Sequence, residues 1–483
     1  MNGLGRSFSP PEEYTAAGGY RLLPLRFLSL DEARYVVTGL AGDYAVLERS
    51  DLRALVGHEL CPGSKLYEDL KGKHLIADGD SQVYRDLLAA KYRTKQARLP
   101  AWTALHMFVV TLRCDHTCQY CQVSRVSEDR ASFDMTPAVA DRAIDLMLQS
   151  PSPTLKVEFQ GGESLLNFEL VKYVVNEVER RIGARQVAFV ITTNLANLTD
   201  EMIDFAGHHG ILFSTSLDGP AALHNANRPR PGRDSHARVI ESIERIRARL
   251  GPDAVAALMT STAESLRQPE AIIDEYVARG FRSIFLRYIS PYGFAVKTRS
   301  RIGYETEEFI EFFKRGLKYI IRLNLEGTPL RETYTQLLLE RILSPYPTGY
   351  VDLQSPAGMG IAGIVYNYDG GVYAADEGRM LAEMGDQTFR LGHVDDTYEK
   401  LFLESPLLPM VHETMTEGLP GCVDCAFQPY CGSDPIFHHR TQGDPVGHRP
   451  TSAFCKRNMS LMRHIIQLLE DDPKSARVLK SWL

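Results

Sequence analysis

The 483-residue chain has few cysteines, no long apolar stretch and no excess of basic residues. Its eight cysteines are far below the density of a disulfide-stabilised secreted protein. An apolar run of about 18 residues, the length that spans a membrane, does not occur, and the first residues lack the basic and apolar segments of a signal peptide. A formal net charge of -7 argues against nucleic acid as the main partner. We therefore expect a cytoplasmic protein that acts neither on nucleic acid nor at a membrane.

The first hundred residues have a pattern of their own within a chain long enough for two or three domains. Residues 34–48 predict two short strands around a Gly-Asp turn, and residues 50–60 and 64–75 predict short amphipathic helices. Residues 84–98 read as a charged connecting helix. We therefore assign residues 1–100 to a small α+β, winged-helix-like module and its linker.

Apolar, β-branched runs alternate with helical segments in the next part of the chain. Six such runs separated mostly by helices of 3.6-residue period predict a parallel sheet with right-handed crossovers. We therefore predict an α/β fold, a partial (β/α)6 TIM-like barrel with bridging helices over residues 101–343, whose chemistry lies at the carboxyl ends of the strands. The runs are 106–112, 155–159, 187–191, 211–217, 254–259 and 283–288.

The last part of the chain begins after a proline-rich break at residues 344–349. Residues 360–374 predict a hairpin with an Asp-Gly-Gly turn, and a cysteine-rich segment follows. Residues 456–471 predict an amphipathic helix that closes the chain. We assign residues 344–460 to a separate domain and residues 461–483 to a C-terminal helix.

Three cysteines stand close together just after the first predicted barrel strand. Cys114, Cys118 and Cys121 have the spacing CxxxCxxC, with which a short loop can bind three corners of a 4Fe-4S cube. The fourth iron then lacks a cysteine, and an iron with an open site can chelate a small molecule. A zinc site is the alternative, but structural zinc usually takes four ligands, and His116 inside the loop is poorly placed as the fourth.

A glycine pair and a glutamate follow the second predicted strand, in the segment Gln160-Gly161-Gly162-Glu163. Two glycines let the backbone approach a ligand closely, and the Glu163 carboxylate can accept hydrogen bonds from a cationic amine. A glycine pair alone is often only a turn, so the motif gains its weight from its place behind the three cysteines.

Together these motifs resemble the signature of the radical S-adenosylmethionine (radical SAM) superfamily. The superfamily's cysteine motif is CxxxCxΦC, in which Tyr120 is the aromatic Φ, and its GGE motif binds the amino group of the SAM methionine. The resemblance implies a SAM-binding 4Fe-4S cluster with an open iron site. It also implies that the reduced cluster cleaves SAM, and that the resulting 5′-deoxyadenosyl radical abstracts a hydrogen atom from the substrate.

The end of the fourth predicted strand continues the resemblance. Residues 216–220 (SLDGP) with His224 and Arg228 are similar to the S(I/L)DGPxxxHxxxR stretch of the peptide-modifying branch. The resemblance implies that the Ser216 hydroxyl contacts SAM and that Arg228 is a partner for the SAM carboxylate. The alternative is a tight turn in which Asp218 caps a helix and Arg228 is solvated.

The candidate site residues fall into two groups. The cofactor-binding candidates are Tyr120, Gln160, Gly161, Gly162, Glu163, Thr193, Asn194, Ser216, Arg228 and Leu286, of which Leu286 fits the core equally well. The catalytic candidates are Cys114, Cys118, Cys121 and Asp218, and Tyr288, Tyr292 and Asp376 are further candidates for a proton or hydrogen donor.

Four further cysteines near the end resemble half of a SPASM extension, a domain that carries two auxiliary clusters. They are Cys422, Cys425, Cys431 and Cys455. The cysteines of the other half are replaced, at Pro435, at Ala375 and at the upstream position that we assign to Ser355. The resemblance implies one auxiliary 4Fe-4S cluster, which would accept or relay electrons; structural zinc is the alternative. Cys61, next to Pro62, is expected to be a buried or idle thiol.

Details of the sequence resemble one group of peptide-modifying enzymes more than others. The N-terminal YRLLPLRF and the tail CAFQPYCGSDP are most similar to radical SAM maturases of the His-Xaa-Ser system. That resemblance implies a ribosomally made precursor peptide, a paired maturase, and a reductant such as flavodoxin or ferredoxin. A winged-helix-like module often clamps the leader of such a peptide by strand addition, or it only shields the barrel.

Two other functions stay open at this stage. A sulfatase maturase that forms formylglycine shares the DGP region but normally keeps both auxiliary clusters. From a different class, the chain would be a non-catalytic iron-sulfur protein, and failure to cleave SAM would favour that interpretation.

Overall fold

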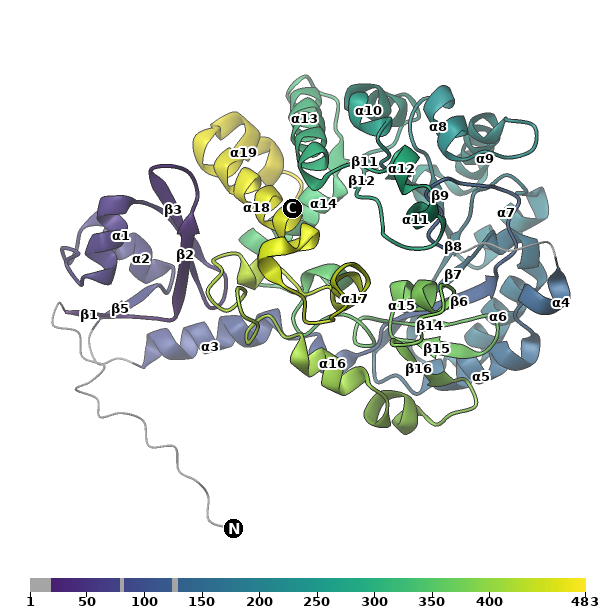
Figure 1. The fold of residues 1–483 in the computed structure, drawn as a ribbon, viewed down its shortest axis with the longest axis horizontal. Coiled ribbons are helices and arrows are strands. Elements are labelled where there is room, and N and C mark those ends of the chain that lie inside the picture. Colours follow the sequence, from purple (N-terminus) through teal and green to yellow (C-terminus); the bar gives the residue numbers. More distant parts are fainter. Residues whose placement is uncertain (1–18, 79–81, 124–128) are drawn as a thin grey trace, which may run out of the picture. The chain divides into compact units, whose positions relative to one another are not determined.

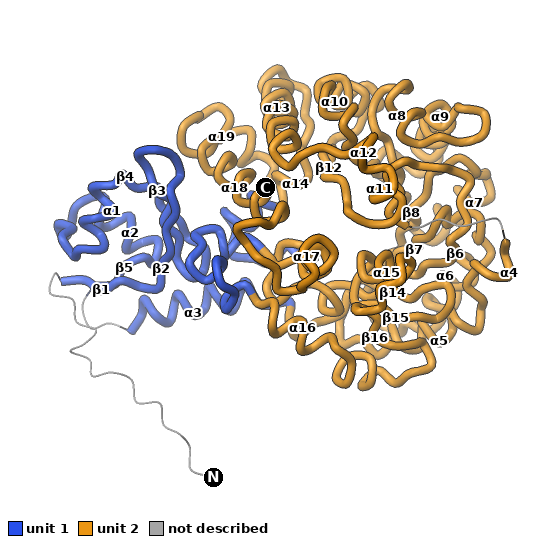
Figure 2. The backbone as a smooth tube through the Cα atoms, viewed as in Figure 1, with its two compact units in different colours: residues 1–98, 338–348, 416–431 blue, residues 99–337, 349–415, 432–483 orange. Residues whose placement is uncertain are grey.

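The computed structural model describes residues 19–78, 82–123 and 129–483, and the chain forms two compact units (Figure 2). The first unit joins three separate stretches, Met1–Arg98, Leu338–Thr348 and Thr416–Cys431. The second unit comprises Leu99–Leu337, Gly349–Met415 and Gly432–Leu483.

The first unit is built on a three-stranded antiparallel sheet with the order β2-β3-β4 (Figure 1). Two short helices pack on it through buried leucines such as Leu55 and Leu70, and Tyr20 lies in the same core. The predicted strands and amphipathic helices are therefore confirmed. The elements are β1 (Tyr20–Leu22), β2 (Leu25–Ser29), β3 (Arg34–Gly39), β4 (Tyr44–Glu48), α1 (Arg49–Val56), α2 (Lys65–Gly72), β5 (Ile76–Asp78), which pairs with β1, and α3 (Val83–Lys95).

The cysteine-bearing segment 416–431 packs on this N-terminal module inside the same unit, a contact that the sequence does not predict. The Tyr430 hydroxyl donates to the carbonyl of Gly42 at 2.7 Å, and Arg341 donates to the carbonyl of Tyr430 at 2.7 Å. Lys95 on α3 donates to the carbonyl of Arg341 at 3.2 Å. Residues more than 300 positions apart in the chain thus share one core.

The second unit contains a nine-stranded sheet with the order β12-β10-β9-β8-β7-β6-β14-β15-β16. Its strands from β12 to β14 run parallel, and helices such as α5, α6, α9 and α10 connect them on the outside (Figure 1). The predicted α/β fold with six barrel strands is confirmed, although the sixth run divides into two very short strands. The barrel strands are β6 (Leu105–Thr111), β7 (Thr154–Gly161), β8 (Gln186–Thr192), β9 (Leu212–Ser216), β10 (Val255–Thr260) and β12 (Leu286–Arg287). The first part of the sixth run, β11 (Ser283–Ile284), pairs in parallel with β13 (Arg331–Glu332) in a separate two-stranded sheet.

The helices between these strands begin where the sequence indicates. Thr136 caps α5, its hydroxyl accepting from the backbone N–H of Val139 at 3.3 Å, and Pro137 stands at the first helical position. The helices are α4 (Arg130–Phe133), α5 (Pro137–Leu148), α6 (Phe168–Arg181), α7 (Asp200–His208), α8 (Ala221–Asn227), α9 (Ser235–Leu250), α10 (Pro269–Ala278), α11 (Phe294–Lys297) and α12 (Arg299–Ile302).

The predicted hairpin forms, and it also joins the barrel sheet. β14 (Gly363–Tyr366) and β15 (Gly371–Tyr373) pair antiparallel, and β16 (Arg390–His393) extends them. β14 also pairs in parallel with β6, where His106 stacks on Tyr366 and its Nδ1 lies 3.1 Å from the tyrosine hydroxyl. The hairpin therefore widens the sheet on the side of its first strand.

The C-terminal segment contains one helix more than expected. α18 (Ala453–Asp471) matches the predicted helix, but α19 (Pro473–Lys480) follows it, so the expectation that α18 closes the chain is wrong. Asp472 ends α18 and caps α19, because the Pro473 nitrogen has no hydrogen to continue the first helix. The remaining helices are α13 (Thr306–Leu325), α14 (Thr333–Leu343), α15 (Asp376–Ala382), α16 (Leu407–Glu413) and α17 (Pro435–Gln442).

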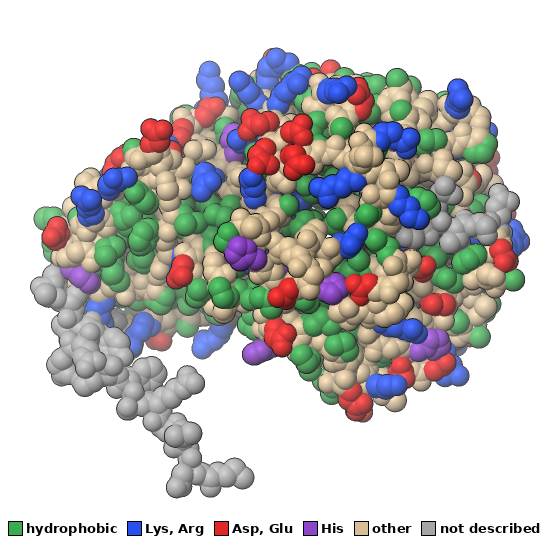
Figure 3. Space-filling view, in the orientation of Figure 1, with side chains coloured by type: hydrophobic (Ala, Val, Ile, Leu, Met, Phe, Trp, Pro, Cys, Tyr) green, Lys and Arg blue, Asp and Glu red, His purple; other side chains and the backbone are tan. Residues whose placement is uncertain are grey.

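The helices and the surface charges agree with the apolar content and the net charge of the sequence. Among the described residues, none of the helices combines the length and apolar character of a membrane span. On the face seen in Figure 3, basic and acidic side chains are mixed.

One buried carboxylate connects the last barrel strand to the bridging helices. Glu332, in the short strand β13 (Arg331–Glu332), is 0% exposed and accepts from the backbone N–H groups of Leu286 at 3.1 Å and Thr335 at 2.5 Å. Burial raises the pKa of Glu332 to about 7. This side chain holds β12 in place at the edge of the sheet.

We expect Glu332→Ala to lower the free energy of unfolding of the second unit by about 2–4 kcal/mol, because two buried N–H groups lose their acceptor. Glu332→Gln should cost less, since a neutral amide oxygen still accepts. Thermal denaturation followed by circular dichroism measures both, with Glu326→Ala, a change at the exposed end of α13, as the control. Equal melting temperatures for Glu332→Ala and Glu326→Ala would contradict the assignment.

Candidate functional site

The site begins where β6 and β7 end side by side. A Cβ on Gly162 would lie 2.3 Å from the carbonyl oxygen of Arg113, and one on Gly161 would lie 2.1 Å from that of Thr111. The N–H groups of Gly162 and Glu163 donate to these two carbonyls, each at 2.8 Å. The glycine pair is therefore needed for the close approach of two backbones, and it places Glu163 beside the start of the cysteine loop.

Glu163 is a buried carboxylate surrounded by hydrogen-bond donors. Its Oε1 accepts from the Thr193 hydroxyl at 2.5 Å and from the N–H of Leu165 at 3.0 Å, and its Oε2 accepts from the N–H of Asn194 at 2.7 Å. Burial raises its pKa to about 7 in spite of these donors. None of the ion pairs in the described part of the chain includes Glu163. A cationic amine placed here would therefore meet a carboxylate that is already oriented and that lacks a cation.

Asn194 fixes the start of the cysteine loop. Its side-chain amide donates to the Asp115 carboxylate at 2.7 Å and lies 2.9 Å from His116 Nδ1. The other ring nitrogen of His116 lies 3.0 Å from the Ser235 hydroxyl. Both nitrogens of His116 thus have partners within the protein, which supports the view that it is not a metal ligand.

The rest of the loop is held by backbone contacts with two distant segments. The N–H groups of Thr117 and Gln119 donate to the carbonyls of Pro229 at 2.7 Å and Asn227 at 2.9 Å. The carbonyl of Cys121 accepts from the N–H of Phe294 at 2.7 Å. The Thr298 hydroxyl donates to the carbonyl of Gln119 at 2.6 Å. The loop is therefore ordered by the protein itself.

The three thiols of the loop influence one another electrostatically. Burial raises the pKa of Cys118 to about 11, and the neighbouring Arg228 guanidinium opposes this rise. Burial, Glu163 and Cys118 also raise the pKa of Cys114. Within the described residues, no three His, Cys, Asp or Glu side chains are close enough to hold a single metal ion.

Asp218 and Arg228 meet at the hydroxyl of Tyr120. The hydroxyl donates to Asp218 Oδ2 at 2.5 Å and accepts from the Arg228 guanidinium at 3.1 Å, and the guanidinium lies 5.8 Å from the ring centre. Asp218 is 0% exposed, and burial raises its pKa. The structure thus brings the aromatic residue of the cysteine motif together with both charged residues of the SLDGP stretch.

The other predicted residues have more ordinary surroundings. Gln160 donates to the Glu158 carboxylate at 2.9 Å, and Ser216 ends β9 opposite Leu258 of β10. Leu286 is 1% exposed and packs toward Gly316 of α13, so its side chain belongs to the core. Of the donor candidates, Tyr288 and Tyr292 line a cavity, and Asp376 pairs with Arg379.

The second cysteine group is divided between the two units. Cys422, Cys425 and Cys431 lie in the first unit, where the N–H of Cys425 donates to the carbonyl of Cys422 at 3.0 Å. Cys455 lies in the second unit, in the first turn of α18, and its sulfur is 3.6 Å from that of Met459. Cys61 is exposed.

An ion pair between Arg113 and Asp134 lies next to the cysteine loop and is not predicted from the sequence. Arg113 donates to the Asp134 carboxylate at 2.7 Å and to the carbonyl of Leu166 at 2.7 Å, and it fixes the turn just before Cys114. No spacing signal joins these residues, because Asp134 lies 21 positions further along the chain.

Comparison with known proteins relates the part of the chain that contains the cysteine loop to a known family. The family model of the Radical SAM superfamily matches residues 108–284, from β6 to β11. An uncharacterized protein of Methanothermobacter thermautotrophicus is 27% identical over 179 residues, which are 37% of this chain and 65% of that protein. A cysteine-type anaerobic sulfatase-maturating enzyme of Clostridium perfringens is 23% identical over 302 residues, which are 60% of this chain and 77% of that enzyme.

Solved structures show the same fold. Native anSMEcpe with bound AdoMet has a TM-score of 0.63 at 16% identity, over 78% of this chain and 99% of that one. Streptococcus suis SuiB bound to the precursor peptide SuiA has a TM-score of 0.53 at 12% identity, over 89% of this chain and 98% of that one. At such identities the likeness establishes the fold alone. The family match covers the strands, the cysteine loop and the Glu163 turn, and the chain therefore carries a domain of the radical SAM superfamily.

Proposed function

We propose that the protein is a radical SAM maturase that abstracts a hydrogen atom from a ribosomally made peptide, giving a crosslink, an epimer or an oxidised residue. The observation that carries this proposal is the placement of an ordered CxxxCxxC loop beside Glu163, a buried carboxylate without a cation. A non-catalytic iron-sulfur protein would need no acceptor for an amine next to its cluster.

The chain's own residues would hold the cofactors as follows. Cys114, Cys118 and Cys121 would bind three irons of a 4Fe-4S cluster, and Glu163 would accept from the amino group of SAM. When bound, the reduced cluster and SAM supply a 5′-deoxyadenosyl radical. Thr193 and the backbone of Asn194 orient Glu163 through their hydrogen bonds.

Arg228 would act through charge beside the same loop. Its guanidinium is close enough to the sulfurs of Cys114 and Cys118 and to the Asp218 carboxylate to have its own pKa raised by them, although burial opposes this rise. Asp218 and Tyr120 hold it there. A fixed cation next to thiolates stabilises their charged form, which is the form that binds iron.

The second cysteine group would hold one auxiliary 4Fe-4S cluster. Its four cysteines match the number of irons, which leaves no open site, so this cluster would accept or relay electrons. Zinc in a four-cysteine site is the alternative. A flavodoxin or ferredoxin would supply electrons, and the reducing cytoplasm is the compartment in which eight free cysteines persist.

A peptide substrate is supported by the fold. The structure of SuiB was solved with a precursor peptide, and its fold covers most of this chain. Within this class we favour a maturase of the His-Xaa-Ser system acting with a paired enzyme, on the sequence details of both ends of the chain. The rival is formation of formylglycine, as in the sulfatase-maturating relative; the three replaced cysteines argue against it.

The N-terminal module would clamp the leader of the precursor. In the sheet order β2-β3-β4 the outer strands β2 and β4 are the places where a peptide strand can add. Phe27 on β2 is 45% exposed and offers an apolar contact there. If Phe27→Asp leaves the affinity for a leader peptide encoded beside the enzyme unchanged, β2 is not the clamp.

We expect anaerobically reconstituted protein to form 5′-deoxyadenosine from SAM with a strong reductant, and a triple variant with Cys114, Cys118 and Cys121 changed to Ala to form none. Mass spectrometry measures the product. The wild type should hold about eight irons and the variant about four, as two and one 4Fe-4S clusters require. No product from an iron-loaded wild type would contradict the proposed catalysis.

We expect Glu163→Gln to weaken SAM binding by a factor of about 10–100, because a charge-assisted hydrogen bond to the amino group is lost. Equilibrium dialysis with reconstituted protein gives the Kd. Glu169→Gln, on the exposed side of α6, is the control and should bind SAM like the wild type. A Kd for Glu163→Gln within twofold of the wild-type value would remove Glu163 from the site.

A further inference from the structure

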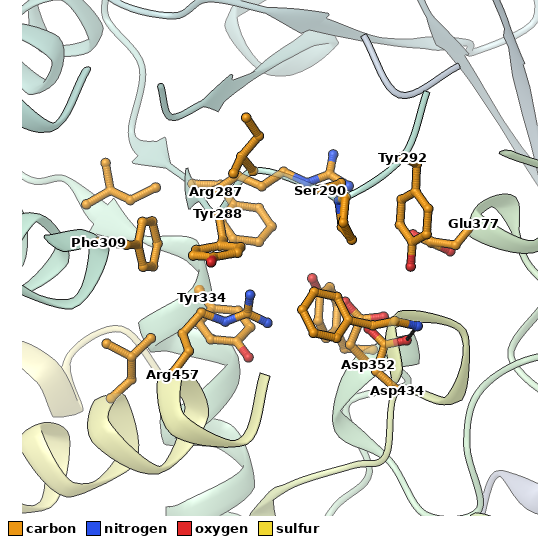
Figure 4. A pocket seen from close by; sticks show the side chains of 17 residues that line it. Arg287, Tyr288, Ser290, Tyr292, Phe309, Tyr334, Asp352, Glu377, Asp434 and Arg457 are labelled. Atoms are coloured by element: carbon orange, nitrogen blue, oxygen red, sulfur yellow. Dashed lines mark hydrogen bonds between the residues drawn. The ribbon is translucent and has the colours of Figure 1, made fainter. Parts of the chain in front are cut away.

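A small charged cavity lies within the second unit, between the loop after β12 and the helices α13, α15, α17 and α18 (Figure 4). Its lining combines three carboxylates with two arginines and several aromatic rings. It is lined by Phe285, Leu286, Arg287, Tyr288, Ile289, Ser290, Pro291, Tyr292, Phe309, Tyr334, Tyr350, Asp352, Glu377, Asp434, Phe437, Arg457 and Leu461.

The two sides of the cavity differ in charge. Figure 4 shows Asp352, Glu377 and Asp434 with Tyr292 on one side, and Arg457 with aromatic rings on the other. Arg457 lies 4.7 Å from the ring centre of Tyr288. With all groups ionised, three carboxylates against two guanidinium groups leave one negative charge in excess.

The neighbouring carboxylates act strongly on Glu377. Burial and then the charges of Asp352, Asp376 and Asp434 raise the pKa of Glu377 to about 8. Arg287 and Arg457 lower the pKa of Asp352 against the effect of burial, and Arg457 and Arg449 act in the same direction on Asp434. The nearby Arg379 is paired with Asp376 at 3.1 Å. At the end of the cavity around Glu377, no ion pair among the described residues includes this carboxylate, and the charges that act on its pKa are those of other carboxylates.

A second, independent feature at this end is the hydroxyl of Tyr292. The residue is 2% exposed, and the hydroxyl has no hydrogen-bond partner among the described residues. Figure 4 shows the ring on the same side of the cavity as the three carboxylates. A buried hydroxyl without a partner is costly, so a ligand that hydrogen-bonds to it would relieve that cost.

The three carboxylates lie next to the positions where the SPASM resemblance has cysteines. Asp352 is three residues before Ser355, Glu377 is two residues after Ala375, and Asp434 directly precedes Pro435. The segments are packed together, because a Cβ on Gly432 would lie 2.5 Å from the carbonyl oxygen of Asp352. The three carboxylates are not close enough to hold one metal ion in the described structure. The region of the replaced ligands has thus become a cavity with an acidic end.

The cavity is large enough only for the end of one side chain. It measures about 80 Å³, which is the volume of two or three water molecules and well below that of a small-molecule site. A larger cavity of about 330 Å³ adjoins it and shares Tyr288, Ile289, Ser290, Pro291 and Phe437 with it. A peptide in the larger cavity could therefore place one side chain in the smaller one.

We propose that the smaller cavity binds one positively charged side chain of the peptide substrate, with Glu377, Asp434 and the Tyr292 hydroxyl facing the cation. The aromatic rings on the other side would contact the methylene groups of that side chain. This inference rests on the proposed function for its peptide substrate, and it adds a specificity that the cysteine loop does not determine.

The test uses reconstituted full-length protein and two probes, N-acetyl-lysine methylamide and N-acetyl-norleucine methylamide, which differ in the ammonium group. Ligand-observed saturation-transfer NMR gives their affinities. We expect the lysine probe to bind at least tenfold more tightly than the norleucine probe. Equal affinities, or tighter binding of an N-acetyl-glutamate methylamide probe, would overturn the proposal.

Variants test whether the preference for the lysine probe arises in the smaller cavity. Glu377→Gln/Asp434→Asn should abolish the preference for the lysine probe, and Asn at position 434 can still cap α17 as Asp434 does through the N–H of Phe437. Asp395→Asn/Glu399→Gln removes the same charge from exposed positions and should keep the preference. A preference that persists in the first variant, or displacement of the lysine probe by Mn²⁺ in the wild type, would assign the binding to another site or to a metal.

The two proposals fail separately. Wild-type protein that forms 5′-deoxyadenosine but does not distinguish the probes would overturn the charged cavity and leave the radical function in place. Protein that prefers the lysine probe but never forms 5′-deoxyadenosine would overturn the radical function and leave the charged cavity in place.

Discussion

The close contact between the ends of β6 and β7 is the constraint on which the site depends. Two glycines without side chains let the turn after β7 lie directly on the backbone of residues 111–113. The same contact therefore sets the positions of Cys114 at the end of one strand and Glu163 at the end of the other. Any larger residue at position 162 would separate the cysteine loop from the carboxylate. The Arg113–Asp134 pair fixes this junction from the other side.

A second constraint is electrostatic. Glu163 and Asp218 are buried, and Cys114 and Cys118 lie half-buried near them; burial disfavours the charged form of each of these four groups. Arg228 is the cation that opposes this effect for Asp218 and Cys118, and Tyr120 links it to Asp218. Glu163 receives neutral donors only. Arg228 thus offsets part of the charge at Asp218 and Cys118, whereas no ion pair of the described residues includes Glu163.

The barrel strands and the motif residues could be predicted because their signals are local. A β-branched run of five to seven residues, or a fixed spacing of cysteines, is visible within a short stretch. The pairing of β14 with β6 could not be predicted, because the partners lie about 260 positions apart and the hairpin alone satisfies its own pattern. The same holds for Tyr430 and Gly42, whose contact joins a cysteine-rich segment to the N-terminal module. The role of Asn194 was also hidden, since only the folded loop brings Asp115 and His116 to it.

Three carboxylates lie close in sequence to the positions where the SPASM resemblance has cysteines. A cluster held by thiolates is an anionic region that the surrounding protein must accommodate. At positions 355, 375 and 435, where the resemblance places SPASM cysteines, this chain has Ser, Ala and Pro, and a carboxylate stands within three residues of each. Arg287 and Arg457 lower the pKa of Asp352, whereas in the described part of the chain no ion pair includes Glu377 and the Tyr292 hydroxyl has no hydrogen-bond partner. The cation recognition that we propose for this region rests on these carboxylates and on the Tyr292 hydroxyl.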